Sequence, residues 1–426
     1  MERYLINYLK EAAEDDLHKK YIDYFKMELD EYIYNYGEHI SSAYRRKQRR
    51  SIISYAHDKI QIIIALYMKP YQQSNLKNIL SCMWWFPIDM ALDADFNLIS
   101  SMFSPWGKKN IIGDKNLLKL LEYKRCAIRK GVFKDLYDTD FFEKLESQKD
   151  KIITQYKKYD FQALFLPTDA HFECKYLIDI FNELKKPSLI FSHGLPGFYS
   201  LDIDNRGDYL MVWGEKIKQN YINTGFDPNK IFVSGNPKYS EFDKTKELRN
   251  SLENILIIPC SSSMWTQLDW GTPLLIDRSM VILYLYKVQS VLKKIGVKHA
   301  RFRPHPSIDK NWVHGFLDHD FYEKDEDSLS ESCSKATLVI GATSTVFLEA
   351  LMYGVNYIIF EPKEKNETLA RWNLVPPFDG SEQDLEIANT EEELEYLVRN
   401  KYQVNVNILH DYMNPLDISV VKNIIS

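Results

Sequence analysis

The sequence has little of what several classes of protein require. It contains five cysteines in 426 residues, in no paired spacing, which predicts reduced thiols in a cytoplasmic protein and no zinc site. Lys and Arg number 54 against 60 Asp and Glu, and the resulting net charge of −6 argues against a general nucleic-acid binder. The apolar run Ile62–Met68 is too short to cross a bilayer. The amphipathic, acidic N-terminus has no signal-peptide pattern.

Basic residues are concentrated in two short runs, Arg45–Arg50 and Lys124–Lys130. Such runs are usually solvated faces, and peripheral contact with an anionic inner membrane or an anionic glycan is the alternative. The sequence shows no internal repeat and no DxD-like metal motif.

What the sequence does contain, from Tyr159 onward, is a regular alternation of short apolar strands and amphipathic helices. Strands about 20 residues apart and separated by helices are typical of doubly wound parallel sheets. The predicted strands are 163–166, 188–191, 209–213 and 231–233, then 255–258, 299–303, 337–340 and 355–360. The predicted fold class is therefore α/β, with two Rossmann-type domains facing a cleft.

The domain boundaries follow from this pattern and from a charged stretch, 238–250, that we interpret as a linker. Residues 1–243 are predicted to form a helical region plus a first Rossmann-like domain, which binds an acceptor. Residues 251–414 form the second, nucleotide-binding domain, and residues 415–426 a C-terminal helix. Residues 1–50 and 115–158 have helical periodicity, and the first α/β domain is predicted to begin within 51–110.

The segment Ser334–Pro362 reads as strand, tight turn, helix and strand, with Gly354 as a helix C-cap. Its turn contains Thr343, Ser344 and Thr345 at the carboxyl end of a strand, where open α/β sheets bind ligands. Backbone N–H groups at a helix start, together with three hydroxyls, suit a phosphate. The alternative is that these hydroxyls only cap the helix.

The segment Arg303-Pro304-His305-Pro306 follows another predicted strand directly. The two prolines fix the direction of His305, which can donate to a phosphate oxygen, and Arg303 can add charge. We expect this turn and the Ser344 turn to lie on neighbouring strands of one sheet. A structural role for a proline-flanked histidine is the alternative.

In the first domain, Asp169 and His193 each follow the carboxyl end of a predicted strand. The topology is expected to bring both toward one crevice, where either can act as a general base.

These motifs resemble those of bacterial GT-B glycosyltransferases of surface-polysaccharide synthesis. The segments RPHPS (303–307) and GATSTVFLEALMYG (341–354) are similar to the CMP-sugar group, the sialic acid, Kdo and nonulosonate transferases. VSGNPKYSEF (233–242) resembles the end of the N-terminal GT-B domain. HGLPG (193–197) is similar to the HGTP turn of CDP-glycerol-type polymerases, which implies a catalytic role for His193, although Leu195 replaces the threonine.

The resemblance implies a transfer of an acidic sugar from a CMP-activated donor to a surface glycan or a lipid-linked acceptor. His305, Ser344 and Thr345 would hold the nucleotide with Arg303, and Asp169 or His193 would be the base. The donor is the only cofactor expected. No metal is expected, because helix N–H groups and His305 can stabilise the leaving phosphate.

Further nucleotide-binding candidates are Glu349, Ser262 and Ser263. Glu349 occupies a helix position at which GT-B enzymes often bind donor hydroxyls, and a surface glutamate is its alternative. Ser262 and Ser263 follow the first strand of the second domain and can contact the donor or cap a helix.

Departures from the family pattern leave other functions open. The acidic Asp/Glu-Gly motif of several sialyltransferase groups is not evident. A CDP-polyol phosphotransferase of the teichoic-acid type, an isomerase like the UDP-GlcNAc 2-epimerases and a non-catalytic glycan-binding protein therefore remain alternatives. The stereochemistry and the oligomeric state are not determined by the sequence.

Overall fold

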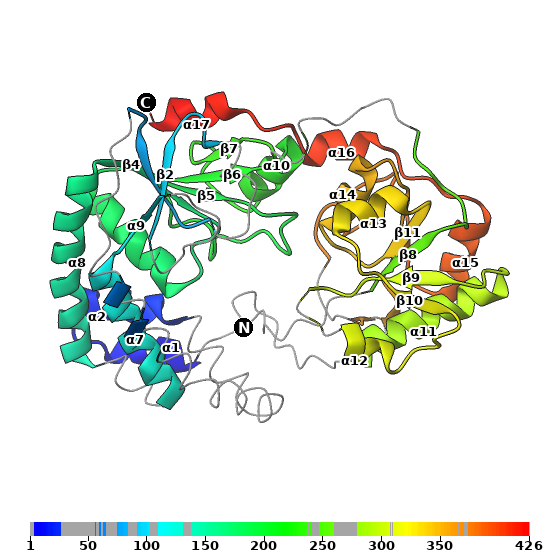
Figure 1. The fold of residues 1–426 in the computed structure, drawn as a ribbon, viewed down its shortest axis with the longest axis horizontal. Coiled ribbons are helices and arrows are strands. Elements are labelled where there is room, and N and C mark those ends of the chain that lie inside the picture. The colour runs from blue at the N-terminus through cyan, green and yellow to red at the C-terminus, as the bar shows by residue number, and fades with distance from the viewer. Residues whose placement is uncertain are drawn as a thin grey trace.

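The computed structural model of the chain describes residues 4–26, 75–83, 92–101, 110–130, 138–236, 247–259, 279–306, 310–364, 367–369 and 374–425, and single positions between them. These residues form two lobes, each built around a parallel sheet (Figure 1). The predicted α/β class with two Rossmann-type domains and an additional helical N-terminal region is confirmed.

The first lobe contains a seven-stranded sheet in the order β3-β2-β1-β4-β5-β6-β7, with every neighbouring pair parallel. The reversal of strand order between β1 and β4 is the Rossmann topology. The strands are β1 (Asn78–Ser81), β2 (Asn97–Ser101), β3 (Asn110–Ile112), β4 (Phe161–Leu166), β5 (Ser188–Phe191), β6 (Tyr209–Val212) and β7 (Ile231–Val233).

The second lobe repeats the same topology, with the order β10-β9-β8-β11-β12-β15 and parallel pairing throughout. Its switch point lies between β8 and β11. The strands are β8 (Ile255–Ile258), β9 (Ala300–Phe302), β10 (Tyr322–Lys324), β11 (Leu338–Gly341), β12 (Tyr357–Phe360) and β15 (Ile387–Ala388). A small antiparallel hairpin, β13 (Lys363–Glu364) and β14 (Glu367–Thr368), follows β12.

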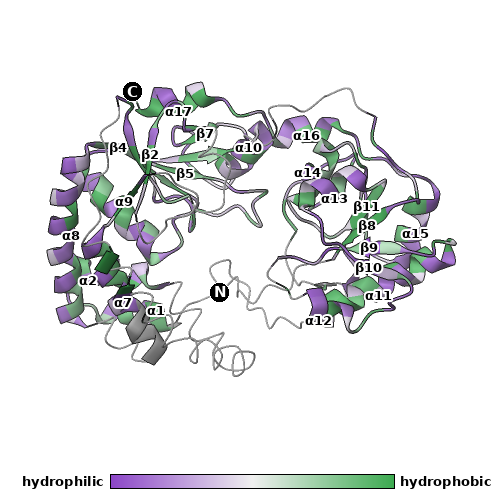
Figure 2. Cartoon of the chain, in the orientation of Figure 1, coloured by the Kyte–Doolittle hydropathy of each residue, from purple (hydrophilic) through white to green (hydrophobic). Residues whose placement is uncertain are grey.

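Amphipathic helices connect the strands, and their apolar sides face the sheets (Figure 2). In the first lobe these are α7 (Lys115–Lys130), α8 (Thr139–Tyr159), α9 (Phe172–Leu184) and α10 (Glu215–Asn223). In the second they are α11 (Ser279–Lys294), α12 (Lys310–His314), α13 (Leu329–Lys335), α14 (Val346–Met352) and α15 (Glu391–Arg399).

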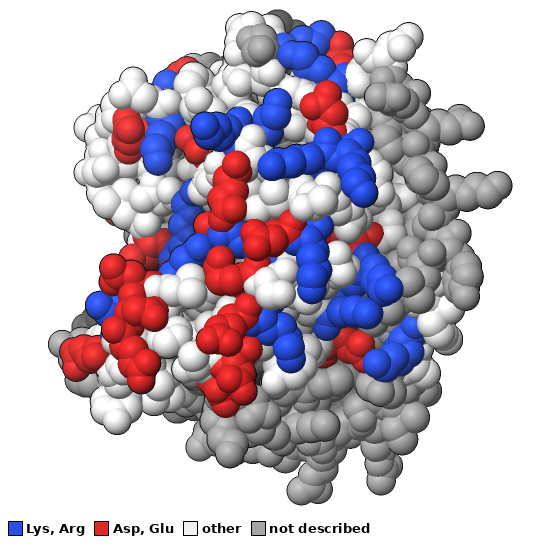
Figure 3. Space-filling model, turned by 90° about the vertical axis from the view of Figure 1, so that its left-hand side faces the viewer, with Lys and Arg blue, Asp and Glu red and all other residues white. Residues whose placement is uncertain are grey.

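The N-terminal helix α2 (Asp16–Tyr24) packs against α8 and α9, and α1 (Tyr4–Ala12) packs on α2. Phe25 stacks on Phe172 with ring centroids 4.6 Å apart, and Tyr21 stacks on Phe142 at 5.6 Å. On the outer face of this lobe, Lys and Arg alternate with Asp and Glu (Figure 3), so the described part of that face has no large patch of one charge. The basic run Arg45–Arg50 lies outside the described residues.

The chain ends by returning to the first lobe, through α16 (Asn407–Tyr412) and α17 (Ile418–Ile425), which lies over that lobe in Figure 1. Val421 and Ile425 pack into the apolar cluster beneath β1 and β2, and each contributes about 1.5–3 kcal/mol by burial. Gly235 permits this crossing, because a Cβ atom there would lie 2.0 Å from the Pro415 carbonyl oxygen. The crossing segment therefore fixes one side of the junction between the lobes.

Among the described residues, no helix combines the length and hydrophobicity needed to cross a membrane.

Candidate functional site

The turn after β11, which we call the Ser344 turn (Ala342–Thr345), lies at the switch point of the second sheet. The Ala342 N–H donates to the Ile258 carbonyl at the end of β8, at 3.0 Å, so the turn lies beside the β8–β11 reversal. Ligands of open α/β sheets bind at this position. The sequence predicted the turn at the carboxyl end of its strand, and the structure adds that this strand borders the switch point.

A buried carboxylate holds the Ser344 turn in shape. Glu361, which follows β12 and is 2% exposed, accepts hydrogen bonds from the Thr343 N–H at 2.5 Å and the Thr343 Oγ1 at 2.7 Å. Burial raises the pKa of Glu361, and the two Thr343 hydrogen bonds oppose that rise. The sequence analysis did not single out Glu361, and its only signal was a charged residue directly after an apolar strand.

The Ser344 hydroxyl oxygen accepts the Val346 N–H at 3.2 Å, whereas Thr345, the N-cap residue of α14, makes no side-chain cap hydrogen bond. The Tyr357 hydroxyl donates to the Ala342 carbonyl at 2.6 Å and fills the space beside Gly341, where a Cβ would lie 2.1 Å from it. Ser344 and Thr345 are both half-buried. The turn is thus a rigid, polar edge rather than an open loop.

The first lobe contacts this turn through residues that follow β5, which we call the His193 turn (Ser192–Leu195). The Leu195 N–H donates to Thr345 Oγ1 at 3.0 Å. A Cβ atom at Gly194 would lie 2.3 Å from the same oxygen, so the close approach requires glycine. The strand-end turns of the two domains therefore meet at one place.

His193 is exposed at this junction, and Ser192 stabilises the turn by donating from Oγ to the Gly194 carbonyl at 3.0 Å. The surrounding protein atoms reduce hydration of the imidazolium and lower the pKa of His193. A histidine with a lowered pKa is neutral near pH 7 and can accept a proton.

Asp169 follows β4, the strand beside β5, as predicted, but its side chain is fully buried. Its two oxygens accept the backbone N–H groups of Asp204, at 2.7 Å, and of Arg206, at 2.8 Å. Arg206 Nη1 lies 3.7 Å from Asp169 Oδ2. In this structure Asp169 therefore anchors the loop that runs from the His193 turn to β6.

His305 lies in the turn after β9, with its side chain exposed, Pro304 buried and the Ile308 N–H donating to the His305 carbonyl at 2.9 Å. The protein atoms around the imidazole reduce hydration of its charged form and lower the pKa of His305. The expectation that this turn and the Ser344 turn lie on neighbouring strands is wrong, because β8 lies between β9 and β11. The two turns flank the end of β8, since a Rossmann sheet grows outward from its first strand in both directions.

The guanidinium of Arg303 forms an ion pair with Asp325 instead of pointing to a phosphate site. Its Nη1 lies 2.9 Å from Asp325 Oδ2 and 2.6 Å from the Asp327 carbonyl, and the Asp325 side chain is 1% exposed. Arg301 binds the other Asp325 oxygen at 3.0 Å. Both arginines therefore compensate a buried charge between β9, β10 and α13.

The remaining candidates divide by location. Glu349 lies on α14, half-buried, and its negative charge is among the causes that raise the pKa of Tyr239, after burial. Ser262 and Ser263 lie outside the described residues. Among the described residues, no group of three or more His, Cys, Asp or Glu side chains is arranged to hold a metal ion.

No protein-family model matches the chain, and no curated protein matches it. Among solved structures, the UDP-GlcNAc 2-epimerase of Methanocaldococcus jannaschii is similar, with 15% identity and a TM-score of 0.46 over 82% of this chain and 99% of that one. The UDP-GlcNAc 2-epimerase of Neisseria meningitidis has 10% identity and a TM-score of 0.45, over 82% and 98% of the two chains.

The wall teichoic acid polymerase TagF has 11% identity and a TM-score of 0.42, over 89% of this chain and 97% of that one. All three TM-scores lie below 0.5.

Proposed function

We propose that the protein is a GT-B enzyme that acts on a nucleotide-activated sugar, bound where the His193 turn meets the Ser344 turn. The observation that carries the proposal is the hydrogen bond from Leu195 N–H to Thr345 Oγ1, 150 residues away. It joins a strand-end turn of one Rossmann sheet to the switch point of the other. This contact supports a ligand site at the switch point of the second sheet with the exposed imidazole of His193 beside it.

The nucleotide end of the ligand is assigned to the second domain. His305 and the Ser344 turn flank the end of β8 and offer a neutral imidazole N–H and hydroxyl groups to phosphate oxygens. Arg303 is not included in this set, because its guanidinium neutralises Asp325. The preference for a CMP-linked acidic sugar rests on the motif resemblance alone.

For the chemical step we propose glycosyl transfer with His193 as the general base toward an acceptor hydroxyl. His193 is exposed and its pKa is lowered, so its imidazole is unprotonated at neutral pH. The Asp169 carboxylate is enclosed by backbone N–H groups and cannot reach a substrate without dismantling the loop that it anchors. We assign Asp169 to positioning.

The second candidate is an isomerase of nucleotide sugars, the epimerase alternative from the sequence. A phosphate site at the Ser344 turn, with a neutral histidine opposite, would suit epimerisation as well as glycosyl transfer. The two differ in their need for an acceptor, since an epimerase converts the donor by itself.

Two experiments in sequence test the proposal. Thermal shift with CMP, CDP, UDP and GDP should identify one nucleotide that raises the melting temperature by mass action. The corresponding sugar nucleotide, incubated with and without glycan acceptors, then distinguishes transfer from epimerisation. The absence of a shift with all four nucleotides would contradict a nucleotide-sugar enzyme.

A further inference from the structure

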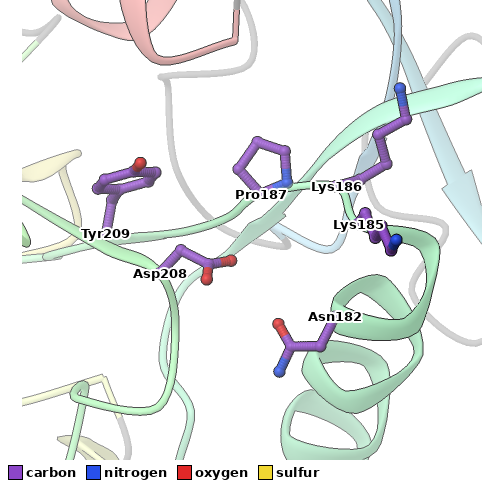
Figure 4. A pocket seen from close by; sticks show the side chains of 6 residues that line it. All are labelled: Asn182, Lys185, Lys186, Pro187, Asp208 and Tyr209. Atoms are coloured by element: carbon purple, nitrogen blue, oxygen red, sulfur yellow. The ribbon is translucent and has the colours of Figure 1, made fainter.

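A cavity of about 270 Å³ opens at the amino ends of β5 and β6, at the opposite end of these strands from the His193 turn. Six residues line it (Figure 4): Asn182, Lys185, Lys186, Pro187, Asp208 and Tyr209. We propose that this cavity is a carbohydrate site that binds one uncharged pyranose unit. The proposal goes beyond the proposed function and does not depend on it.

The carboxylate of the cavity is held in a fixed position. Asp208 Oδ2 accepts the Ser188 N–H and the Ser188 hydroxyl, both at 2.8 Å, and Ser188 is fully buried. Within the described part of the chain, no hydrogen bond engages Asp208 Oδ1. This oxygen can accept from a ligand hydroxyl without the cost of ordering the side chain.

Other polar groups around the cavity are also available. Among the described residues, no hydrogen bond or ion pair engages the side chains of Asn182, Lys185 or Tyr209. Figure 4 shows the Asn182 amide and the Asp208 carboxylate turned toward one another across the cavity. An amide donates and accepts, a carboxylate accepts and an ammonium donates, which together match neighbouring sugar hydroxyls.

Rings supply an apolar surface beside these groups. The Tyr209 ring is held edge-on against Phe232, with centroids 5.7 Å apart, and the Pro187 ring is a second ring that lines the cavity. The C–H face of a pyranose can pack on such rings while its hydroxyls meet the polar groups. Lys186 is directed away, since its Nζ donates to Gln162 Oε1 at 2.8 Å.

The charges and the size restrict the ligand. Asp208 disfavours an anion such as phosphate, and Lys185 disfavours a cation, so an uncharged polyhydroxylated molecule fits best. The volume is just below the range of roughly 300–1,000 Å³ typical of drug-sized ligands, which suits a single sugar ring. Pro187 and His193 are separated by about 15–20 Å along β5, so the cavity is separate from the junction of the two turns.

Ligand-observed saturation-transfer NMR with the full-length protein tests the proposal. The probes are the methyl glycosides of glucose, galactose and N-acetylglucosamine. Each is used at a concentration above the Kd expected for a ligand of this size, which is on the order of 1 mM. At least one glycoside should receive saturation from the wild-type protein. Tyr209→Ala and Asn182→Ala should each weaken its binding about tenfold or more, as the loss of a stacking or hydrogen-bonding group implies.

Tyr396→Ala is the matched control, because Tyr396 is 64% exposed on α15 and far from the cavity in sequence and fold. It should bind like the wild-type protein. Asn182 is exposed, so Asn182→Ala provides a folded variant even if Tyr209→Ala unfolds. No saturation transfer to any of the three glycosides, or unchanged transfer in both cavity variants, would overturn the proposal. Neither result bears on nucleotide binding at the Ser344 turn.

Discussion

Asp169 and Asp204 each accept the backbone N–H of the other. The Asp204 N–H lies 2.7 Å from Asp169 Oδ1, and the Asp169 N–H lies 3.3 Å from Asp204 Oδ1. Thr168 Oγ1 donates to the same Asp204 oxygen at 3.0 Å. Burial and the nearby Asp169 charge raise the pKa of Asp204 to about 7.

We expect Asp204 to make stability pH-dependent. Its pKa is about 7 in the folded protein and about 3.9 in an unfolded chain, so the folded state binds more protons between these values. The free energy of unfolding should therefore fall as pH rises from 4 to 7. Asp204→Asn cannot ionise and should reduce this fall by about 1–3 kcal/mol, measured by urea unfolding at several pH values.

The control for that measurement is Asp202→Asn, an exposed carboxylate in the same loop. Its stability profile should follow that of the wild-type protein. An unchanged pH dependence in Asp204→Asn would show that Asp204 is ionised throughout.

We expect His193→Ala to lower turnover by about a hundredfold or more and to leave nucleotide affinity nearly unchanged, because a base acts in the transition state. In the wild-type protein the acid limb of the rate profile should have a midpoint below about 6.5, since the surrounding protein atoms reduce hydration of the imidazolium and lower the pKa of His193. Calorimetry and initial rates measure the two effects separately.

Asp169→Asn is the informative comparison for His193. It should lower stability and turnover together, through the loop that Asp169 anchors. If a stable Asp169→Asn variant loses all turnover while His193→Ala keeps it, the two roles must be exchanged.

Gly194→Ala should disrupt the junction between the domains, because the new Cβ would lie 2.3 Å from Thr345 Oγ1. Loss of the Leu195–Thr345 hydrogen bond is worth about 0.5–1.5 kcal/mol, which predicts up to a tenfold drop in kcat/KM. The test is a double-mutant cycle with Thr345→Ala. Gly194→Ala should lower kcat/KM much less in the Thr345→Ala protein than in the wild-type protein, because the Thr345 hydroxyl is already absent. Additive effects would show that the two turns do not act together.

We expect His305→Ala to weaken nucleotide binding about tenfold to a hundredfold without loss of stability, because in the proposed site its exposed imidazole would donate one hydrogen bond to phosphate. Calorimetry with the nucleotide that gives a thermal shift measures the change.

Arg303→Ala is the contrasting variant for that measurement. It should cost about 3–5 kcal/mol of stability, because it removes a partner of the buried Asp325 carboxylate. If Arg303→Ala is stable and His305→Ala binds normally, Arg303 is the phosphate ligand of this turn.

The sequence by itself determined most of the strands and the residues that follow them. The predicted strands 188–191, 231–233 and 255–258 agree with β5, β7 and β8 residue for residue. β5 and β8 are buried along their whole length, as the short apolar runs of a parallel sheet are, whereas β7 is a half-buried edge strand. The same pattern placed His193 and Asp169 after adjacent strands, as the structure does.

Strands β2 and β3 were missed because they are short and polar. Asn97 donates through Nδ2 to Asn78 Oδ1 at 2.8 Å, and Asn110 donates to Asn97 Oδ1 at 2.7 Å. Only this ladder of side-chain hydrogen bonds, which forms after the strands have paired, makes burial of the asparagines favourable.

The partners of the residues at the strand ends depend on the tertiary structure and could not be predicted from the sequence. Asp169 became a buried anchor because its partners Asp204 and Arg206 lie 35 and 37 residues further along the chain. Arg303 binds Asp325, and the Leu195 N–H donates to Thr345. Each of these contacts joins two segments that no local sequence pattern connects. Periodicity reports which residues face a core, whereas the choice between a free and a committed polar group depends on partners that only folding brings within hydrogen-bonding distance.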